Sequence, residues 1–197
     1  MQSDRLRLRP LLLGLTLLIF GQLIIGATMR HAHAGLSIPD FPLAYHKLWP
    51  PMDAASVAAY NDNRLAVNET NPITAFQIGL QMVHRLTALL IFCVVLACAV
   101  LTRRFGSRHP LARGARFLLG LIFCQIILGA ATIWSNKAAD IATLHVVVGA
   151  LSLVTTALLT IVAFRVLIPA RAAIPAATPS AQAPFASPKP VVPASGH

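Results

Sequence analysis

Four long runs of apolar residues, separated by polar or charged stretches, dominate the pattern along the chain. They cover residues 11–29, 74–101, 116–134 and 138–168. A helix needs roughly 20 consecutive apolar residues to cross a bilayer, and each run is close to that length or longer. The pattern therefore predicts four transmembrane helices, of which the second and fourth are long enough to tilt or to project from the bilayer.

The first run has a second interpretation, as a secretory signal peptide. Arginines precede it, and Ala-His-Ala at 32–34 resembles a cleavage site. Its apolar stretch of about 18 residues exceeds the 7–15 residues usual for that part of a signal peptide. We therefore favour its retention as a membrane helix.

The charged residues are distributed unevenly over the connections between these runs. The connection 30–73 carries three Lys or Arg residues and four acids, whereas 102–115 carries four arginines and no acid. Because basic residues accumulate on the cytoplasmic side of membrane proteins, both termini and the second connection are predicted to be cytoplasmic. The first connection and the short turn at 135–137 are predicted to lie outside.

Composition supports a membrane protein and argues against a soluble one. The chain of 197 residues is 56% hydrophobic and 11% charged, with a formal charge of +10. Such a basic balance suggests nucleic acid as a partner for a soluble chain, but here the arginines flank apolar runs, so we expect a lipid bilayer and no nucleic acid. We expect a cytoplasmic N-terminus at 1–10, a membrane domain at 11–168, and a disordered cytoplasmic tail rich in Pro, Ala and Ser at 169–197.

An internal repeat relates the first and third runs. Residues 18–27 align with 121–130, with a Gln-x-x-x-Gly pair in register in both. Equivalent helices would run in the same direction, so the repeat predicts two helical hairpins related by a pseudo-two-fold axis along the membrane normal. The expected fold class is an all-α membrane protein, a four-helix bundle made of these two hairpins.

Each hairpin carries one histidine in its second helix, His84 and His145. An ionisable residue inside a membrane span is costly and usually marks a functional site. At 1.5 Å per residue, the two histidines lie roughly 15 and 10 Å from the outer ends of their runs, which places them at a similar depth. The alternative is a structural role, in which a membrane histidine only forms a hydrogen bond to a neighbouring helix.

The surroundings of the two histidines favour a heme held between two imidazoles. Small residues, Ala88 and Gly149, follow the histidines by one helical turn. A porphyrin needs such small neighbours and separates its ligand helices beyond the usual 8–10 Å. The two histidine helices are therefore predicted to stand diagonally opposite, with the first and third helices closing the sides.

The arginine beside the first histidine needs a partner at that depth. Arg85 has no acid available inside the spans except Asp140 at the rim. Heme propionates would supply the missing partner, or the side chain would extend outward to the membrane surface. Met29, Met82 and Cys93 could in principle ligate iron, but core packing is favoured for all three.

Other candidate ligands give weaker signals. All three cysteines, Cys93, Cys98 and Cys124, fall inside apolar runs, so they form no disulfide framework or zinc site and are expected in the core. The outer connection contains His31, His33 and His46, of which the His-x-His pair is a weak metal signal. Its Pro, Trp and Tyr residues predict an ordered cap at the membrane interface, over the mouth of the heme site.

These residues together resemble the heme A synthase family of cytochrome oxidase assembly proteins. The resemblance rests on five segments in sequence order: Gly-Ala-Thr-Met-Arg at 26–30, Gly-Leu-Ser-x-Pro-Asp-Phe-Pro-Leu at 35–43 followed by Trp-Pro-Pro at 49–51, the His84-Arg85 pair, Gln-x-x-x-Gly at 125–129, and His145. Family members usually have eight spans in two four-helix halves, each with one histidine pair. The resemblance implies that one pair holds heme b and the other binds heme O, whose methyl group is oxidised to the formyl of heme A. His84 and His145 match one such pair.

This chain departs from the family pattern in three ways. It has four spans and hence one heme site, so the resemblance implies a homo-oligomer or pairing with another half. It also implies a bacterial-type inner membrane location, with heme O synthase or cytochrome oxidase assembly factors as candidate partners. Ile38 and Ala44 stand where many bacterial relatives carry loop cysteines, and Gln81 stands where the substrate-binding half tends to carry a glutamate. Gln81 is therefore the candidate catalytic residue.

Three functions remain open from the sequence. The first is a heme A synthase-type oxidoreductase acting on heme O. The second is a non-catalytic b-type heme protein that passes electrons or carries heme during oxidase assembly. The third is a helical scaffold without a cofactor, because membrane histidines can be purely structural.

Overall fold

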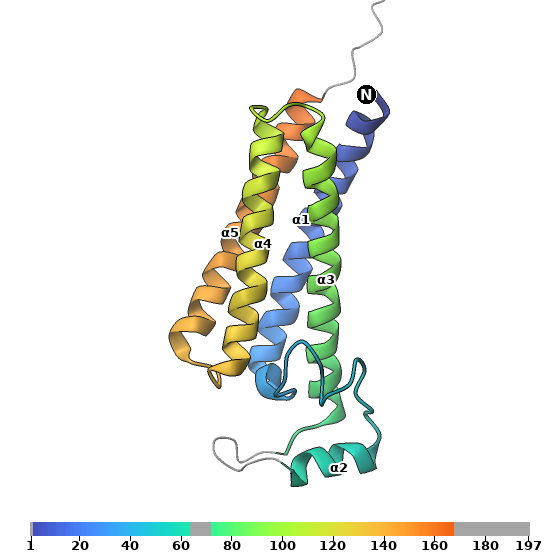
Figure 1. Ribbon diagram of the computed structural model, residues 1–197, viewed down its shortest axis with the longest axis vertical. Coiled ribbons are helices and arrows are strands. Elements are labelled where there is room, and N and C mark those ends of the chain that lie inside the picture. Colours follow the sequence, from blue (N-terminus) through green and yellow to red (C-terminus); the bar gives the residue numbers. More distant parts are fainter. Residues whose placement is uncertain (1, 64–71, 168–197) are drawn as a thin grey trace, which may run out of the picture.

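The computed structural model describes residues 2–63 and 72–167, with side chains from residue 7 onward. This part of the chain is a bundle of four long helices with an irregular segment at one end (Figure 1). The long helices are α1 (Gln2–His31), α3 (Ala75–Arg103), α4 (Pro110–Trp134) and α5 (Ala139–Val166). All four are long and apolar enough to cross a membrane, which confirms the predicted all-α membrane fold. The predicted tail at 169–197 lies outside the described residues.

Helices α1, α3 and α4 extend beyond the apolar runs that predicted them, whereas α5 lies within its run of 138–168. Helix α1 begins nine residues before the predicted start at residue 11, and α4 begins at Pro110 rather than at residue 116. Hydropathy detects only the part of a helix that lies in hydrocarbon, whereas the helical hydrogen bonds continue into the charged ends. Pro110 occupies the first turn of α4, where a missing N–H group costs nothing.

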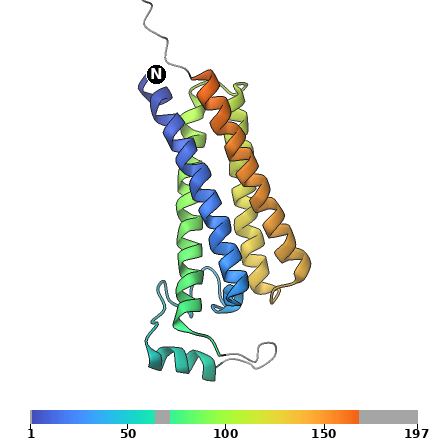
Figure 2. The ribbon, with the colours of Figure 1, turned by 180° about the vertical axis from the view of Figure 1, so that it is seen from behind.

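The four helices form a closed ring. Helix α1 packs against α3 and α5, and α4 also packs against α3 and α5. Figure 2 shows α1 between α3 and α5 from behind, and Figure 1 shows α4 in front. Helices α3 and α5, which carry His84 and His145, therefore stand diagonally opposite. This confirms the arrangement predicted from the spacing that a heme would require.

A tightly packed apolar cluster fills the half of the bundle near the N-terminus. Its buried members come from all four long helices and are Leu8, Leu12, Leu15, Ile19, Ile91, Val95, Cys98, Leu111, Leu118, Ile122, Leu159 and Ala163, with Leu167 just beyond α5. Leu159 of α5 lies so close to Gly114 of α4 that a side chain there would collide with it. This half of the bundle fixes the helix positions, because interiors packed at this density leave little freedom.

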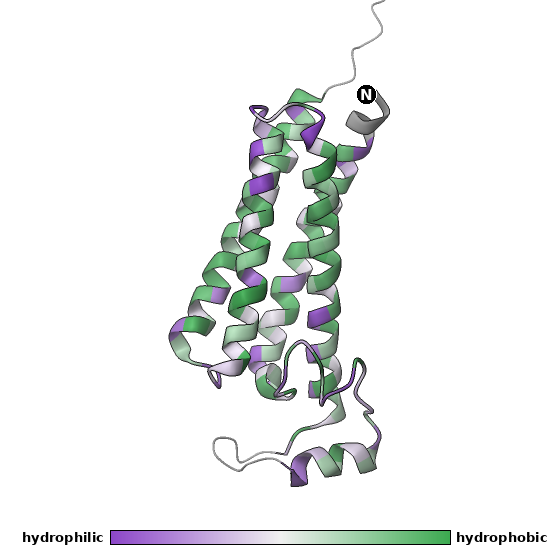
Figure 3. Cartoon of the chain, viewed as in Figure 1, coloured by the Kyte–Doolittle hydropathy of each residue, from purple (hydrophilic) through white to green (hydrophobic). Residues whose placement is uncertain are grey.

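Hydrophobic residues dominate the lengths of the four long helices, and hydrophilic residues are more frequent at the two ends of the bundle (Figure 3). Large side chains such as Leu17, Leu89 and Leu158 point outward and are more than half exposed. This distribution suits a helix bundle in lipid. Of the three cysteines, only Cys98 is buried, so the expectation of a core position was wrong for Cys93 and Cys124. Their runs are apolar on every face, so hydropathy cannot show which face points inward.

The outer connection is ordered over its described part, 32–63, as the sequence predicted. It contains a single 3-10 turn, η1 (Ala34–Leu36), and a short helix, α2 (Ala54–Asp62), which the apolar pattern did not predict. Asp53 caps α2 by accepting a hydrogen bond from the backbone of Ser56 at 3.0 Å. Bonds from Ser56 also lower the pKa of Asp53. An acidic residue at this position is a usual start signal for a helix.

Polar residues of α3 anchor this connection. Gln77 donates to the Ala32 carbonyl at 2.7 Å. One turn further, the buried Gln81 side chain accepts hydrogen bonds through Oε1 from the Ser37 hydroxyl at 2.8 Å and from the Ile38 backbone at 2.7 Å. These bonds connect residues more than 40 positions apart in sequence, and they seat the connection on the outer end of α3.

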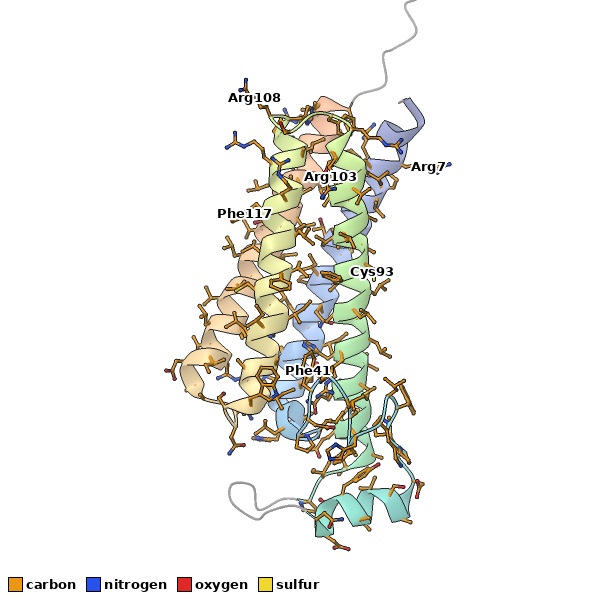
Figure 4. The ribbon with its side chains drawn as sticks, viewed as in Figure 1. Arg7, Phe41, Cys93, Arg103, Arg108 and Phe117 are labelled. Carbon is orange, nitrogen blue, oxygen red and sulfur yellow. The ribbon has the colours of Figure 1, made fainter. Side chains whose placement is uncertain are left out.

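Arg85 continues this row by one more turn. Its guanidinium donates to the Leu43 carbonyl at 2.8 Å and to the Asp40 carbonyl at 2.7 Å. Its charged carbon lies 5.7 Å from the centre of the Phe41 ring, which in turn contacts Trp134 edge-on with ring centroids 6.4 Å apart. Figure 4 shows Phe41 at this end of the bundle. The connection is therefore a roof fixed to α3 that reaches the end of α4.

We expect Gln81→Leu to loosen this roof without unfolding the bundle. The substitution removes the acceptor of two short hydrogen bonds and leaves the buried Ile38 N–H group without a partner, which costs about 1–3 kcal/mol. Hydrogen exchange at Ile38 should become faster, and proteolysis between residues 36 and 50 should become easier. Thr87→Leu, which removes a hydroxyl bonded only within α3, to the Val83 carbonyl, is the matched control. Unchanged protection of Ile38 in Gln81→Leu would contradict the assigned anchoring role.

Candidate functional site

The structure places His84 and His145 on diagonally opposite helices. Both side chains are half-buried, and the Nδ1 atom of each ring is buried. Both lie between the apolar cluster and the roof formed by the outer connection. An ionisable pair in this position is unusual inside a membrane bundle, where such groups typically face a functional interior.

Each imidazole lies against a glycine of the neighbouring helix. A Cβ atom placed on Gly26 of α1 would lie 3.6 Å from His84 Cε1, and one on Gly129 of α4 would lie 3.4 Å from His145 Cε1. A side chain larger than the methyl group of alanine at either glycine would displace the ring. The two histidines therefore have equivalent environments, each between its own helix and a glycine-bearing helix.

The positions of these glycines also fix the relative depth of the rings. Gly26 precedes the last residue of α1, His31, by five positions, and Gly129 precedes the last residue of α4, Trp134, by five positions. At 1.5 Å per residue, both glycines lie about 7.5 Å from the outer ends of their helices. The imidazoles packed against them therefore lie at a matching level, as their positions within the apolar runs predicted.

Two glutamines flank the same rings. Gln22 lies one turn before Gly26 and donates through Nε2 to the His84 backbone carbonyl at 3.0 Å. Gln125 has the equivalent position one turn before Gly129. Among the described residues, five buried side-chain nitrogen or oxygen atoms have no hydrogen-bond partner, and four of them are Nδ1 of the two histidines and Oε1 of the two glutamines. Buried polar atoms are normally paired, so the presence of four unpaired atoms on these two histidines and two glutamines indicates a functional site.

Gly149 and Ala88 were predicted to line the porphyrin. Gly149 is buried, and a Cβ atom there would lie 2.7 Å from Gln125 Nε2 and 3.1 Å from Leu23 Cδ2. The missing side chain at Gly149 thus makes room for Gln125 of α4. Ala88 is half-buried on α3, one turn from His84.

The structure gives Gln81 and Arg85 a different immediate environment from the one expected. All hydrogen bonds of the Gln81 side chain lead to the outer connection, including two longer ones from Nε2 to the carbonyls of Gly35 and Ile38 at 3.4 Å. Arg85 finds backbone carbonyls as partners, so the reasoning that it requires a propionate was wrong. The sequence could not reveal these carbonyls, because they become available only when the connection folds onto α3.

The other candidate ligands are not gathered at the site. His31, His33 and His46 are exposed, and in the described ranges no group of three or more His, Cys, Asp or Glu residues could hold a metal ion. Met82 packs in a small apolar cluster beneath the roof, and Met29 is buried. Cys93 faces outward (Figure 4). Packing therefore describes the two methionines, as expected.

Four residues of the site belong to the sequence repeat but were not predicted to lie there: Gln22, Gly26, Gln125 and Gly129. The signal was present, because a Gln-x-x-x-Gly pair places both residues on one face of a helix one turn apart. What the sequence lacked was the rotation of α1 and α4, which decides whether that face meets the imidazoles or the lipid.

Comparison with known proteins agrees with this architecture. Residues 2–158 match the cytochrome oxidase assembly protein family. The chain is 30% identical over 128 residues to a heme A synthase of Methylobacterium radiotolerans, in a match that covers 64% of this chain and 32% of the relative. A heme A synthase of Bacillus cereus is 29% identical over 133 residues, which covers 67% of this chain and 36% of the relative.

The chain spans about a third of the length of these curated relatives. No solved structure matches it significantly. The family match nevertheless covers all four long helices except the last turns of α5, together with the outer connection and both histidines. On this match, the chain belongs to the cytochrome oxidase assembly protein family.

Proposed function

We propose that the protein is a heme A synthase-type membrane oxidoreductase, which oxidises a methyl group of heme O to the formyl group of heme A for cytochrome oxidase assembly. The observation that carries the proposal is the pair of depth-matched imidazoles on diagonal helices, each packed against a glycine. Family membership supplies the chemical context, since relatives of this chain bear the name heme A synthase.

The residues at the site fit a heme with two axial histidines. His84 and His145 approach from opposite sides of the bundle, and their buried Nδ1 atoms have no protein partner. A ring that coordinates through Nε2 keeps its proton on Nδ1, so both imidazoles can ligate iron in the neutral form. Gly26 and Gly129 leave space beside the rings. We propose His84 and His145 as the axial ligands, with Ala88 and Gly149 as small neighbours.

When bound, heme supplies a redox-active iron centre at the junction of the four helices. The chain contributes orientation and exclusion of water. His84 and His145 set the plane of the ligand, and the roof held by Gln81 and Arg85 covers the outer end of the site. The two terminal nitrogens of Arg85 each donate one N–H group to a backbone carbonyl of the roof. The remaining N–H groups of the guanidinium are available to bind a heme propionate.

The described residues carry one pair of membrane histidines. Heme b as cofactor and heme O as substrate, if they occupy separate sites, need a second pair. We propose a homo-oligomer in the membrane, with heme O synthase or other oxidase assembly factors as partners that deliver or accept heme.

We propose that the end of the bundle that carries the arginines faces the cytoplasm. Arg7, Arg103 and Arg108 lie at the end of the bundle opposite the roof (Figure 4). Basic residues mark the cytoplasmic side, which puts the roof and the histidine site on the outer side of a bacterial-type inner membrane.

One observation favours the second candidate, a non-catalytic b-type heme protein for electron transfer or heme handling. Gln81 carries no ionisable carboxyl group, and its amide is committed to the roof. Asp40 is the acid of the roof whose backbone carbonyl binds Arg85. Its two carboxylate oxygens accept hydrogen bonds from the backbone N–H groups of Tyr45 and His46 at 2.7 and 2.8 Å. A protein with these residues can hold heme without a carboxylate positioned for proton transfer.

We expect His84→Ala and His145→Ala each to abolish six-coordinate heme. Either change removes an axial ligand, so the optical and electron paramagnetic resonance spectra should lose their low-spin signals, and heme retention should fall at least tenfold. His31→Ala, His33→Ala and His109→Ala, at exposed or peripheral positions, serve as controls and should bind heme normally. An unchanged low-spin spectrum in either membrane variant would reject the ligand assignment.

Co-expression with a heme O source distinguishes the two candidate functions. For the oxidoreductase, pigment extracted from membranes should contain heme A, and the His84→Ala variant should produce none. Extraction of heme b alone, from a protein with a normal low-spin spectrum, would support the heme carrier and reject the synthase. A colourless protein obtained when heme is plentiful would reject both functions.

A further inference from the structure

The two glutamines of the repeat have no role in the function proposed so far, and they carry a further inference. Gln22 on α1 binds the backbone of His84, and Gln125 on α4 fills the space at Gly149, one turn after His145. The amide oxygens of both glutamines and the Nδ1 atoms of both histidines are buried and unpartnered. An amide oxygen accepts hydrogen bonds, and a protonated Nδ1 atom donates one. The four unpaired atoms therefore form two complementary sets.

The orientation of the Gln22 amide is determined by its environment. Its Nε2 atom donates to the backbone carbonyl of His84 at 3.0 Å, and a flipped amide would direct two oxygens at each other. The Oε1 atom is consequently the free end, and it belongs to a side chain already bound to His84. This oxygen is therefore available to accept a hydrogen bond from Nδ1–H of His84.

The second hairpin repeats the arrangement. Gln125 Nε2 occupies the space left by the missing side chain of Gly149, at 2.7 Å from where its Cβ atom would lie. Its Oε1 atom is unpartnered, as is Nδ1 of His145. The backbone carbonyl of Gln125 also faces the His145 ring and is a competing acceptor. The same residue types at equivalent positions around both rings argue against a coincidence of packing.

We propose that Gln22 and Gln125 are positioning residues that accept a hydrogen bond through Oε1 from Nδ1–H of His84 and His145 when the opposite ring nitrogens coordinate heme iron. The inference rests on the proposed heme ligation. Such a bond fixes the tautomer and the plane of each ring and makes the imidazole a stronger donor to the metal. A stronger donor stabilises ferric over ferrous iron, so the glutamines lower the reduction potential of the bound heme.

The experiment uses the full chain in detergent, reconstituted with hemin, and four variants: Gln22→Leu, Gln22→Glu, Gln125→Leu and Gln125→Glu. Leucine removes the acceptor, and glutamate keeps an acceptor while removing the amide donor. We expect each leucine variant to shift the ratio of ferric to ferrous affinity about tenfold toward ferrous heme, which equals a rise of about 59 mV for a one-electron couple. Each glutamate variant should retain the wild-type potential or lower it.

The low-spin electron paramagnetic resonance spectrum gives a second measurement, because its g values depend on the planes of the two imidazoles. Both leucine variants should change these g values, and the glutamate variants should restore them. Cys124→Leu introduces the same side chain next to Gln125 on the exposed side of α4 and should leave both measurements unchanged. A general packing defect would instead alter the leucine and glutamate variants alike.

The outcomes separate this inference from the proposed heme site. If the wild type binds hemin in a low-spin form and the leucine variants keep its potential and g values, the glutamine side chains do not act on the rings, and the inference is overturned while the heme site stands. If the wild type itself shows no low-spin heme, the heme site and the inference fall together. If a leucine variant fails to fold, the glutamate variant at the same position still tests it, because a rise in potential there would overturn the inference.

Discussion

The structure depends on the need of polar groups inside a membrane bundle to find partners within the chain, because hydrocarbon offers none. Arg85 meets this need with two backbone carbonyls and Gln81 with a hydroxyl and a backbone N–H group, all from the outer connection. These bonds turn an irregular segment into a roof. The exceptions among the described side chains are Nδ1 of His84 and His145, Oε1 of Gln22 and Gln125, and Nε of Arg9, which are buried without a hydrogen-bond partner.

One half of the bundle stabilises the fold, and the other half carries the candidate functional site. Near the N-terminus, leucines and isoleucines of all four helices interlock, and Gly114 allows α4 and α5 to approach closely around Leu159. Toward the roof, the neighbours of the rings are glycines and glutamines instead. A rigid base allows the outer half to hold unsatisfied polar groups, which a marginal bundle could not tolerate without rearranging.

The sequence predicted those features that depend on local composition and on repetition. Apolar runs predicted four helices, and the similar depths of His84 and His145 within their runs predicted rings at one level. The rotation of a helix about its axis, and hydrogen-bond acceptors supplied by distant segments, were not predictable. Cys124 faces outward although it lies in an apolar run, and Gln81 binds the roof although the resemblance made it the catalytic candidate. The ligand roles of the histidines stay predictions.

The pseudo-two-fold symmetry of the site is broken by the connections, and this asymmetry bears on how a heme would be oriented. The first hairpin contributes the whole roof, whereas α4 and α5 are joined by a tight turn between Trp134 and Ala139. In the sequence, a guanidinium residue, Arg85, follows His84, whereas a valine, Val146, follows His145. A planar ligand held by the two imidazoles would therefore have an arginine beside the first histidine and an apolar side chain beside the second. Its anionic groups would consequently be drawn toward α3 and the roof, leaving the opposite edge of the ring in the apolar part of the bundle.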